Sequence, residues 1–423
     1  MNFGTKIKLI VKDAALRKQI LFVLGALIVF RFMAVIPIPG VDVLQLEQFF
    51  ANNEFLGLLN IFSGGGLANL SLVMLGVGPY ITATIIMQLT TMISPSMREM
   101  YHEEGAAGKK KFTTYSRWLT VPLALLQSFA FLMLLTRSGV VGDLSALGLI
   151  TNVLVISTGS ILLMWIGELM SEFGIGNGVS LIIFAGIVAS IPSLISQRIF
   201  AFDPSQLPLI IGFLIFAVLT TAAVVAVTEA ERPIPITYAK QVRGNKVYGG
   251  VSTYLPLRVN QAGVIPIIFA LSLMLFPQMV LSFLANVNSE IIATISAFIL
   301  EKILGNGWIY AGLYFILVFL FTYFYTAVTF DPENIAKNLQ RSGAFIPGVR
   351  PGQSTSAYIG KIITRITLVG ALFLGVIAVM PIGMQAYTGN AAFAVGGTGL
   401  LIAVSVVIDL IKKVEAQISM REY

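Results

Sequence analysis

The feature that most constrains this chain is a series of ten apolar runs, each long enough to cross a lipid bilayer. A transmembrane helix needs roughly 20 apolar residues to span about 30 Å of hydrocarbon. The chain is 57% hydrophobic and only 11% charged, and its mean hydropathy is +0.88, which is typical of a polytopic membrane protein. The runs lie near residues 18–36, 70–93, 118–136, 150–170, 179–197, 208–228, 261–284, 308–328, 362–381 and 392–411.

The distribution of Lys and Arg predicts the orientation of these runs. If the N-terminus is cytoplasmic, the inner segments carry 22 of the 27 basic residues, whereas the outer segments carry only Arg137, Arg198 and Lys302. Cytoplasmic loops are enriched in basic residues, so we expect both termini in the cytoplasm. The first run resembles a signal peptide, but nine further runs and the lack of a small-residue cleavage site favour a permanent anchor.

The ten runs divide into five and five, and the two sets start on opposite sides of the membrane. Two halves with an odd number of spans form inverted repeats around a pore or a binding site. The sequence therefore predicts an all-α polytopic membrane protein, with ten transmembrane helices in two inverted halves, residues 1–203 and 204–423. The halves share no clear sequence identity, so this symmetry rests on topology alone. The outer loop Arg198–Pro208 is the natural hinge, because its prolines break helices.

A broken apolar segment leads into the second run. Residues 55–62 are apolar but too short to cross the bilayer, and the glycine run Gly64–Gly66 follows them. Irregular backbone persists at membrane depth only inside protein or beside a water-filled cavity. We therefore expect the chain to enclose a space and the short piece to lie in it.

Two long basic loops face the cytoplasm in this topology, residues 229–259 and 329–361. The first contains two strand-like runs around a Gly-Asn turn, which predicts a hairpin over residues 240–248. The second contains Ser342–Gly352, whose prolines and glycines favour a fixed turn over a helix. The loops are either solvated connectors or docking surfaces, and their length beyond the needs of topology favours docking.

The sequence lacks the usual catalytic and metal-binding patterns. It has no cysteine, a single histidine (His102), no Walker-type glycine-lysine loop and no HExxH motif. Ser160 and Ser180 lie without an evident base, and such hydroxyls normally bond to the backbone of their own helix. We therefore expect no catalytic residue, no metal site, no cofactor and no enzymatic activity.

Charged residues within the runs are few. Arg31, Glu168, Arg365 and Asp409 all lie near the ends of their runs, where water can reach them. The alternative function, a secondary transporter of small solutes, normally requires acidic residues near mid-membrane. Because the charged residues of this chain lie near the ends of the runs, their positions favour a passive conduit.

Aliphatic pairs four residues apart occur in the second and fifth runs. Ile81 and Ile85 share one helix face, and Val179 and Ile183 repeat this spacing. Pore-lining and lipid-facing side chains both produce this pattern, so the spacing alone leaves both roles open.

Seven short stretches spread along the chain carry a further signal. They are Asn60–Gly65, Gly78–Ala83, Gly174–Ser180, Thr237–Lys240, Leu255–Pro266, Ser342–Gly352 and Gly396–Ile402. Together they resemble the SecY/Sec61-alpha family, the central subunits of protein-conducting channels. The resemblance covers essentially the whole chain in order, with matching span number and orientation.

This resemblance implies an hourglass pore between two five-helix halves, through which unfolded secretory polypeptides cross the membrane. Apolar segments leave sideways through a lateral gate between the second and third spans and the seventh and eighth. A plug over about residues 56–70 and an aliphatic ring close the pore. The plug maps onto Asn60, Ile61, Phe62, Ser63, Gly64, Gly65, Gly66 and Leu67, and the ring onto Ile81, Ile85, Val179, Ile183, Ile268 and Ile402. Thr84 and Gln88 are candidate gate residues, or else plain helix-packing contacts.

The resemblance also implies partners and a location. We expect a heterotrimer with SecE and SecG in the bacterial cytoplasmic (inner) membrane, in contact with lipid, signal peptides and nascent chains. The SecA ATPase and the ribosome would dock on the two inner loops, at Lys240, Arg243, Lys246, Arg341 and Arg350. Gln241 and Pro233 stand where family members often carry basic residues, which weakens the expectation for the first loop.

Overall fold

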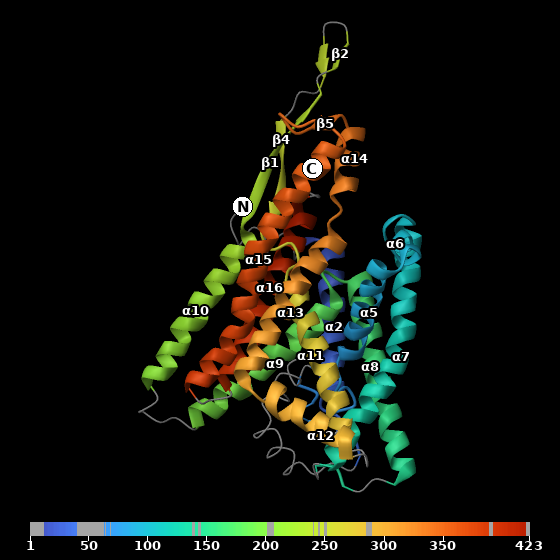
Figure 1. The fold of residues 1–423 in the computed structure, drawn as a ribbon, viewed down its shortest axis with the longest axis vertical. Coiled ribbons are helices and arrows are strands. Elements are labelled where there is room, and N and C mark those ends of the chain that lie inside the picture. Colours follow the sequence, from blue (N-terminus) through green and yellow to red (C-terminus); the bar gives the residue numbers. More distant parts are fainter. Residues whose placement is uncertain are drawn as a thin grey trace.

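The molecule is an elongated bundle of long helices with strands at one end (Figure 1). The computed structural model describes residues 12–39, 63, 65–67, 69–137, 140–142, 145–200, 207–239, 241–243, 246–248, 252–284, 290–388 and 392–419.

Ten long helices within the described residues correspond in order to the ten predicted runs. They are α2 (Ala14–Met33), α5 (Gly78–Ile93), α7 (Gly105–Arg137), α8 (Ala146–Phe173), α9 (Gly178–Phe200), α10 (Leu207–Glu229), α11 (Ile265–Leu284), α13 (Gly307–Thr329), α15 (Gln353–Thr388) and α16 (Ala392–Ser419). Shorter helices are α6 (Pro95–His102), α12 (Glu290–Phe298), the π-helix η2 (Ile299–Leu304) and α14 (Pro332–Arg341). By length and composition alone, four stretches of the described chain qualify as membrane spans: Gly105–Thr136, Ala146–Phe173, Gly307–Arg341 and Gln353–Ala386.

Polar caps fix where several of these helices begin. The Asp13 carboxylate accepts hydrogen bonds from the backbone N–H groups of Ala15 (2.9 Å) and Leu16 (3.3 Å) at the start of α2. The Asn306 side chain accepts one from Trp308 N (3.1 Å) at the start of α13. Each cap satisfies donors that the first turn of a helix leaves unpaired.

The second predicted run is wrong at its beginning. Its helix, α5, starts at Gly78 rather than near residue 70, and the residues before it form buried turns. Gly76 has a positive φ of 57°, which ends any regular helix there. Pro79 occupies the first turn of α5, where a missing N–H costs nothing. Sequence hydropathy alone did not separate buried irregular backbone from helix.

The packing of the helices divides them into two groups. The helices α2, α5, α7, α8 and α9 pack among themselves, and so do α10, α11, α13, α15 and α16. The groups meet where α11 lies against α5 and α7, and where α16 lies against α9. The largest hydrophobic cluster lies at this meeting, because it draws residues from both groups. The domain boundary at residue 203 and the inverted symmetry stay predictions.

Two small antiparallel sheets in the described residues extend one end of the bundle (Figure 1). The predicted hairpin is confirmed as β2 (Gln241–Arg243) paired with β3 (Lys246–Tyr248). In the chain this hairpin lies between β1 (Glu231–Tyr238) and β4 (Ser252–Arg258), which pair with each other in a longer ladder. The strand β5 (Ala344–Phe345) pairs with β1 and adds a short third strand to that ladder.

The sequence did not predict the ladder of β1 and β4, because both strands contain prolines. Pro233 and Pro256 lie opposite each other in the register, and Pro235 follows in β1. Proline normally argues against a strand, since it donates no ladder hydrogen bond. The predicted turn in the second loop is confirmed: α14 ends at Arg341, and turns with positive φ at Gly343, Gly348 and Gly352 follow.

Candidate functional site

The six predicted ring residues come together in the structure. Ile81 and Ile85 project from α5, Val179 and Ile183 from α9, Ile268 from α11, and Ile402 from α16, and all belong to the one large hydrophobic cluster. Five of them are at most 5% exposed, and Val179 packs against them while partly buried. Residues more than 300 positions apart in the sequence therefore form one apolar centre where the two helix groups meet. Its role as a pore ring stays a prediction.

A cavity of about 490 Å³ opens directly beside this apolar centre. Ile81, Val179, Ile183 and Ile268 line part of it, so the aliphatic side chains form one of its walls. The rest of the lining is largely polar and comes from both helix groups: Tyr80, Thr84, Gln88, Thr113, Arg117, Glu168, Ser171, Glu172, Asn177, Ser180 and Tyr325. This cavity, the vestibule, therefore has largely polar walls and is bounded on one side by aliphatic side chains.

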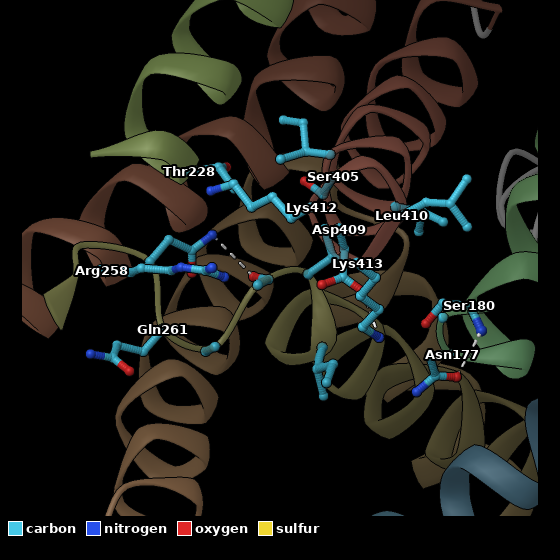
Figure 2. Close-up of a pocket in the computed structure, with 18 of the residues that line it drawn as sticks. Asn177, Ser180, Thr228, Arg258, Gln261, Ser405, Asp409, Leu410, Lys412 and Lys413 are labelled. Atoms are coloured by element: carbon cyan, nitrogen blue, oxygen red, sulfur yellow. Dashed lines mark hydrogen bonds and ion pairs between the residues drawn. The ribbon is translucent and has the colours of Figure 1, made fainter. Parts of the chain in front are cut away.

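A second cavity, of about 320 Å³, adjoins the first (Figure 2). The two share Asn177, Ser180, Ile265 and Tyr325 in their linings. Figure 2 shows charged side chains on its walls, namely Arg258 from the last position of β4 and Asp409, Lys412 and Lys413 from the C-terminal part of α16. The combined space therefore reaches from the apolar centre towards the stranded end of the molecule.

The acidic residues predicted within the spans are ion-paired. Glu168 accepts a hydrogen bond from Arg117 Nε at 2.8 Å, and this pair joins α7 to α8 at the first cavity. Asp409 lies 3.0 Å from Lys413 Nζ one turn along α16. Pairing offsets much of the field that each carboxylate would otherwise exert on the cavity.

The two candidate gate residues differ in their hydrogen bonding. The Thr84 hydroxyl donates to Tyr80 O in its own helix at 2.9 Å, which is the ordinary packing arrangement. Gln88 Oε1 is buried and has no hydrogen-bond partner among the described residues. Both line the first cavity, and α5 packs against α11 there. Of these two residues, Gln88 therefore carries a buried polar atom without a partner among the described residues, and Thr84 does not.

The predicted plug lies partly outside the described residues. Asn60, Ile61, Phe62 and Gly64 are outside, whereas Ser63, Gly65, Gly66 and Leu67 are described. The described part is tightly held: the Ser63 hydroxyl accepts a hydrogen bond from Leu67 N at 2.9 Å, and both residues are at most 1% exposed. Leu67 packs in a separate hydrophobic cluster with side chains of α7 and α8.

The predicted docking residues lie at the stranded end or outside the described chain. Lys240 is outside, and Arg243 is paired with Lys246 in the backbone register of the β2–β3 hairpin. Arg341 and Arg350 are exposed, at the end of α14 and in the turn that follows. These arginines therefore belong to the same end of the molecule as the hairpin (Figure 1).

Sequence reasoning missed one contact beside the site. The Ser160 hydroxyl was expected to bond within its own helix, but it donates to Gly76 O at 2.7 Å, in the buried turns before α5. The neighbouring Gly159 lies against Leu72 O of the same turns. No local pattern in the sequence distinguishes Ser160 from the other helical hydroxyls.

Comparisons with known proteins agree with this architecture. A model of the SecY family matches residues 71–411. The protein translocase subunit SecY of Mycobacterium bovis is 38% identical over an alignment of 452 residues that covers 96% of each chain. A solved structure of SecY, described as showing that its plug domain stabilises the closed state, has a TM-score of 0.68, with 20% identity and coverage of 96% and 93%.

Sec61 in the canine ribosome–channel complex has a TM-score of 0.61, with 18% identity and coverage of 96% of this chain and 94% of its own. These solved structures share the fold, which is that of a polytopic helical membrane protein. The profile match and the sequence identity over nearly the whole length together establish the relationship. The chain belongs to the SecY family.

Proposed function

We propose that this chain forms the channel through which unfolded secretory polypeptides cross a bacterial cytoplasmic membrane. Membership of the SecY family makes it a protein translocation subunit. The observation that carries the mechanism is the joining of six aliphatic side chains from α5, α9, α11 and α16 at the foot of a polar cavity.

An aliphatic constriction of this kind suits a conduit for polypeptides. Water gains few hydrogen bonds between such side chains, so the constriction stays dry and blocks ions when nothing passes. The side chains offer no fixed polar partner to a passing segment, so they can close around many sequences without holding any of them. The predicted ring would then seal the channel both before and during transport.

The contact of α11 with α5 and α7 is the natural position for a lateral opening. Parting these helices would expose the cavity to lipid, into which a sufficiently apolar segment partitions. The halves 1–203 and 204–423 would hinge at the loop between α9 and α10, with the plug over about residues 56–70 closing the outer side. Both termini would be cytoplasmic.

The stranded end supplies a surface for the partners that drive transport. Arg341 and Arg350 are exposed there, beside a hairpin that the β1–β4 ladder extends beyond the helices. The ribosome and the SecA ATPase would bind this end, and SecE and SecG would complete the membrane complex. Hydrolysis of ATP or chain elongation by these partners would supply the energy, and the chain itself would have no enzymatic activity.

Site-specific crosslinking tests the channel function directly. The chain contains no cysteine, so single cysteines report without background. Ile402→Cys lies in the predicted ring and Ser63→Cys in the plug, and Ile215→Cys on the outer face of α10, where Ile215 is 57% exposed, is the matched control. A secretory protein with one cysteine, stalled midway through the membrane, should crosslink to Ile402→Cys and Ser63→Cys but not to the control. Crosslinking to none of the three while transport proceeds would refute the function.

A further inference from the structure

Two adjacent small residues of α8 lie against the buried turns that lead into α5. A Cβ atom added to Gly159 would lie 2.0 Å from Leu72 O and 2.8 Å from Leu72 C. Real Cβ atoms do not approach backbone atoms so closely, so only glycine permits this contact without movement of the chain. The close approach lets α8 touch the backbone of the turns, not just their side chains.

The next residue, Ser160, fixes the same turns through a hydrogen bond. Its hydroxyl donates to Gly76 O at 2.7 Å and is buried, since Ser160 is 1% exposed. Most helical hydroxyls here bond to their own helix, as Thr158 does with Leu154 O at 2.7 Å. Gly76 stands two residues before α5, so this bond acts at the point from which α5 starts.

The chain that follows α2 also holds these turns. Ile38 N donates to Leu70 O at 2.9 Å, and Leu72 N donates to Ile36 O at 3.0 Å. Val73 and Met74, between these contacts and Gly76, are fully buried. The turns therefore contact both the segment after α2 and α8.

We propose that Gly159 and Ser160 are positioning residues for the channel seal. They set the position of residues 70–77, and these set the position of α5, whose first turns carry Ile81 and Ile85. This inference rests on the proposed channel function, because it assigns α8 a part in closing that channel. It predicts that substitution of Gly159 or Ser160 loosens the ring, although neither residue belongs to it.

The effect of each substitution follows from the contact that it changes. Ser160→Ala removes a buried hydrogen bond of the closed channel. We expect this loss to shift the equilibrium from the closed towards the loosened seal by roughly tenfold, and ion leak to rise about tenfold with it. Gly159→Ala must displace the Leu72 carbonyl and should raise the leak more. Both variants should also export a reporter protein whose signal sequence has been weakened, because an already loosened seal opens more readily.

The test uses the purified complex in liposomes, with ion efflux and export of the weakened reporter as readouts. The controls are Gly312→Ala in α13, where nothing lies within 4 Å of the added Cβ, and Thr158→Val, which changes the neighbouring hydroxyl. Yield and thermal midpoint are measured for each variant, since a merely destabilised protein loses transport and cannot gain export of the reporter.

The outcomes separate this inference from the function on which it rests. Increased leak and reporter export in both α8 variants, with controls like wild type, would support the positioning role. If Gly159→Ala does not fold, Ser160→Ala alone decides. Wild-type transport combined with sealed α8 variants overturns the positioning role only. A wild-type complex that carries no polypeptide overturns the channel function itself.

Discussion

The apolar centre and the stranded end of this molecule differ in what they offer a passing or docking polypeptide. The centre is built from buried aliphatic side chains of four helices, and the ion pair beside it joins Arg117 of α7 to Glu168 of α8. The stranded end presents exposed arginines, proline-containing strands and a hairpin held clear of the bundle (Figure 1).

This difference indicates that the two regions have separate roles, one in the passage of polypeptides and the other in docking. A constriction through which many sequences pass works best without fixed polar partners, whereas a docking surface needs charge and defined geometry to select its partner. Substitutions in the centre should therefore change sealing and leave partner binding intact. Substitutions at the stranded end should do the reverse.

The largest effect is expected at the ring. Ile85 is 3% exposed, and Ile85→Gly removes its whole side chain from the apolar centre, which leaves a cavity that water can enter. We expect ion conductance across planar bilayers to rise by at least about tenfold, since the loss of a buried aliphatic side chain costs roughly 2–5 kcal/mol of packing. Ile86→Gly, one residue along the helix and 39% exposed, is the matched control. Unchanged conductance for Ile85→Gly would refute the ring assignment.

Arg350 tests the other side of the comparison. It is exposed in the turn after α14, so Arg350→Ala should leave sealing unchanged. A hydrogen bond to a charged group is worth about 1.5–3 kcal/mol, so we expect ATP-driven export to fall by roughly tenfold or more. Lys302→Ala, in η2 near the opposite end, removes a charge with no expected effect. Normal export by Arg350→Ala would show that docking does not depend on this turn.

The two regions also differ in how far the sequence predicted them. The ten spans followed from apolar run length, and the hairpin followed from its turn residues. The beginning of α5 could not be predicted in the same way. Residues 70–77 are as apolar as a helix, and they are irregular because of their tertiary contacts and the positive φ of Gly76. The β1–β4 ladder was missed because Pro233 and Pro256, read locally, exclude a strand.

The site was predictable only through the family resemblance. A four-residue spacing such as that of Ile81 and Ile85 occurs on any lipid-facing helix, and nothing local links it to Ile402. The contact of Ser160 with Gly76 was not predictable, because the sequence does not show which hydroxyl faces another segment. Spacing places residues on one helix face, but long-range packing decides what that face meets.

A smaller effect is expected at Gln88, which lines the cavity beside the apolar centre. Its Oε1 atom is buried without a partner among the described residues, which costs about 1–3 kcal/mol in this conformation. Gln88→Leu removes that cost, so we expect a higher thermal midpoint and slower lateral release of apolar helices. Gln353→Leu, at the exposed start of α15, is the control. A lower midpoint for Gln88→Leu would show that the amide is satisfied when the channel is sealed.

The smallest effect concerns the ion pair between Arg117 and Glu168. The pair is partly exposed, so its contribution to stability is small, roughly 0–1 kcal/mol. Its value would lie in neutralising Glu168, which lines the first cavity. Arg117→Gln leaves an uncompensated carboxylate there, and we expect severalfold slower passage of Lys-rich polypeptides in low salt, with neutral polypeptides unaffected.

The double substitution Arg117→Gln with Glu168→Gln decides between charge and shape. It removes the uncompensated carboxylate while keeping side chains of similar size, so the rate for Lys-rich polypeptides should return to that of wild type. Persistent slowing in the double variant, or equal slowing of neutral polypeptides, would mean that the pair fixes α7 against α8 and does not act on the cargo. The vestibule would then depend on fixed polar contacts, as the stranded end does. Of the apolar centre and the cavity beside it, the aliphatic ring alone would then differ from the stranded end in this respect.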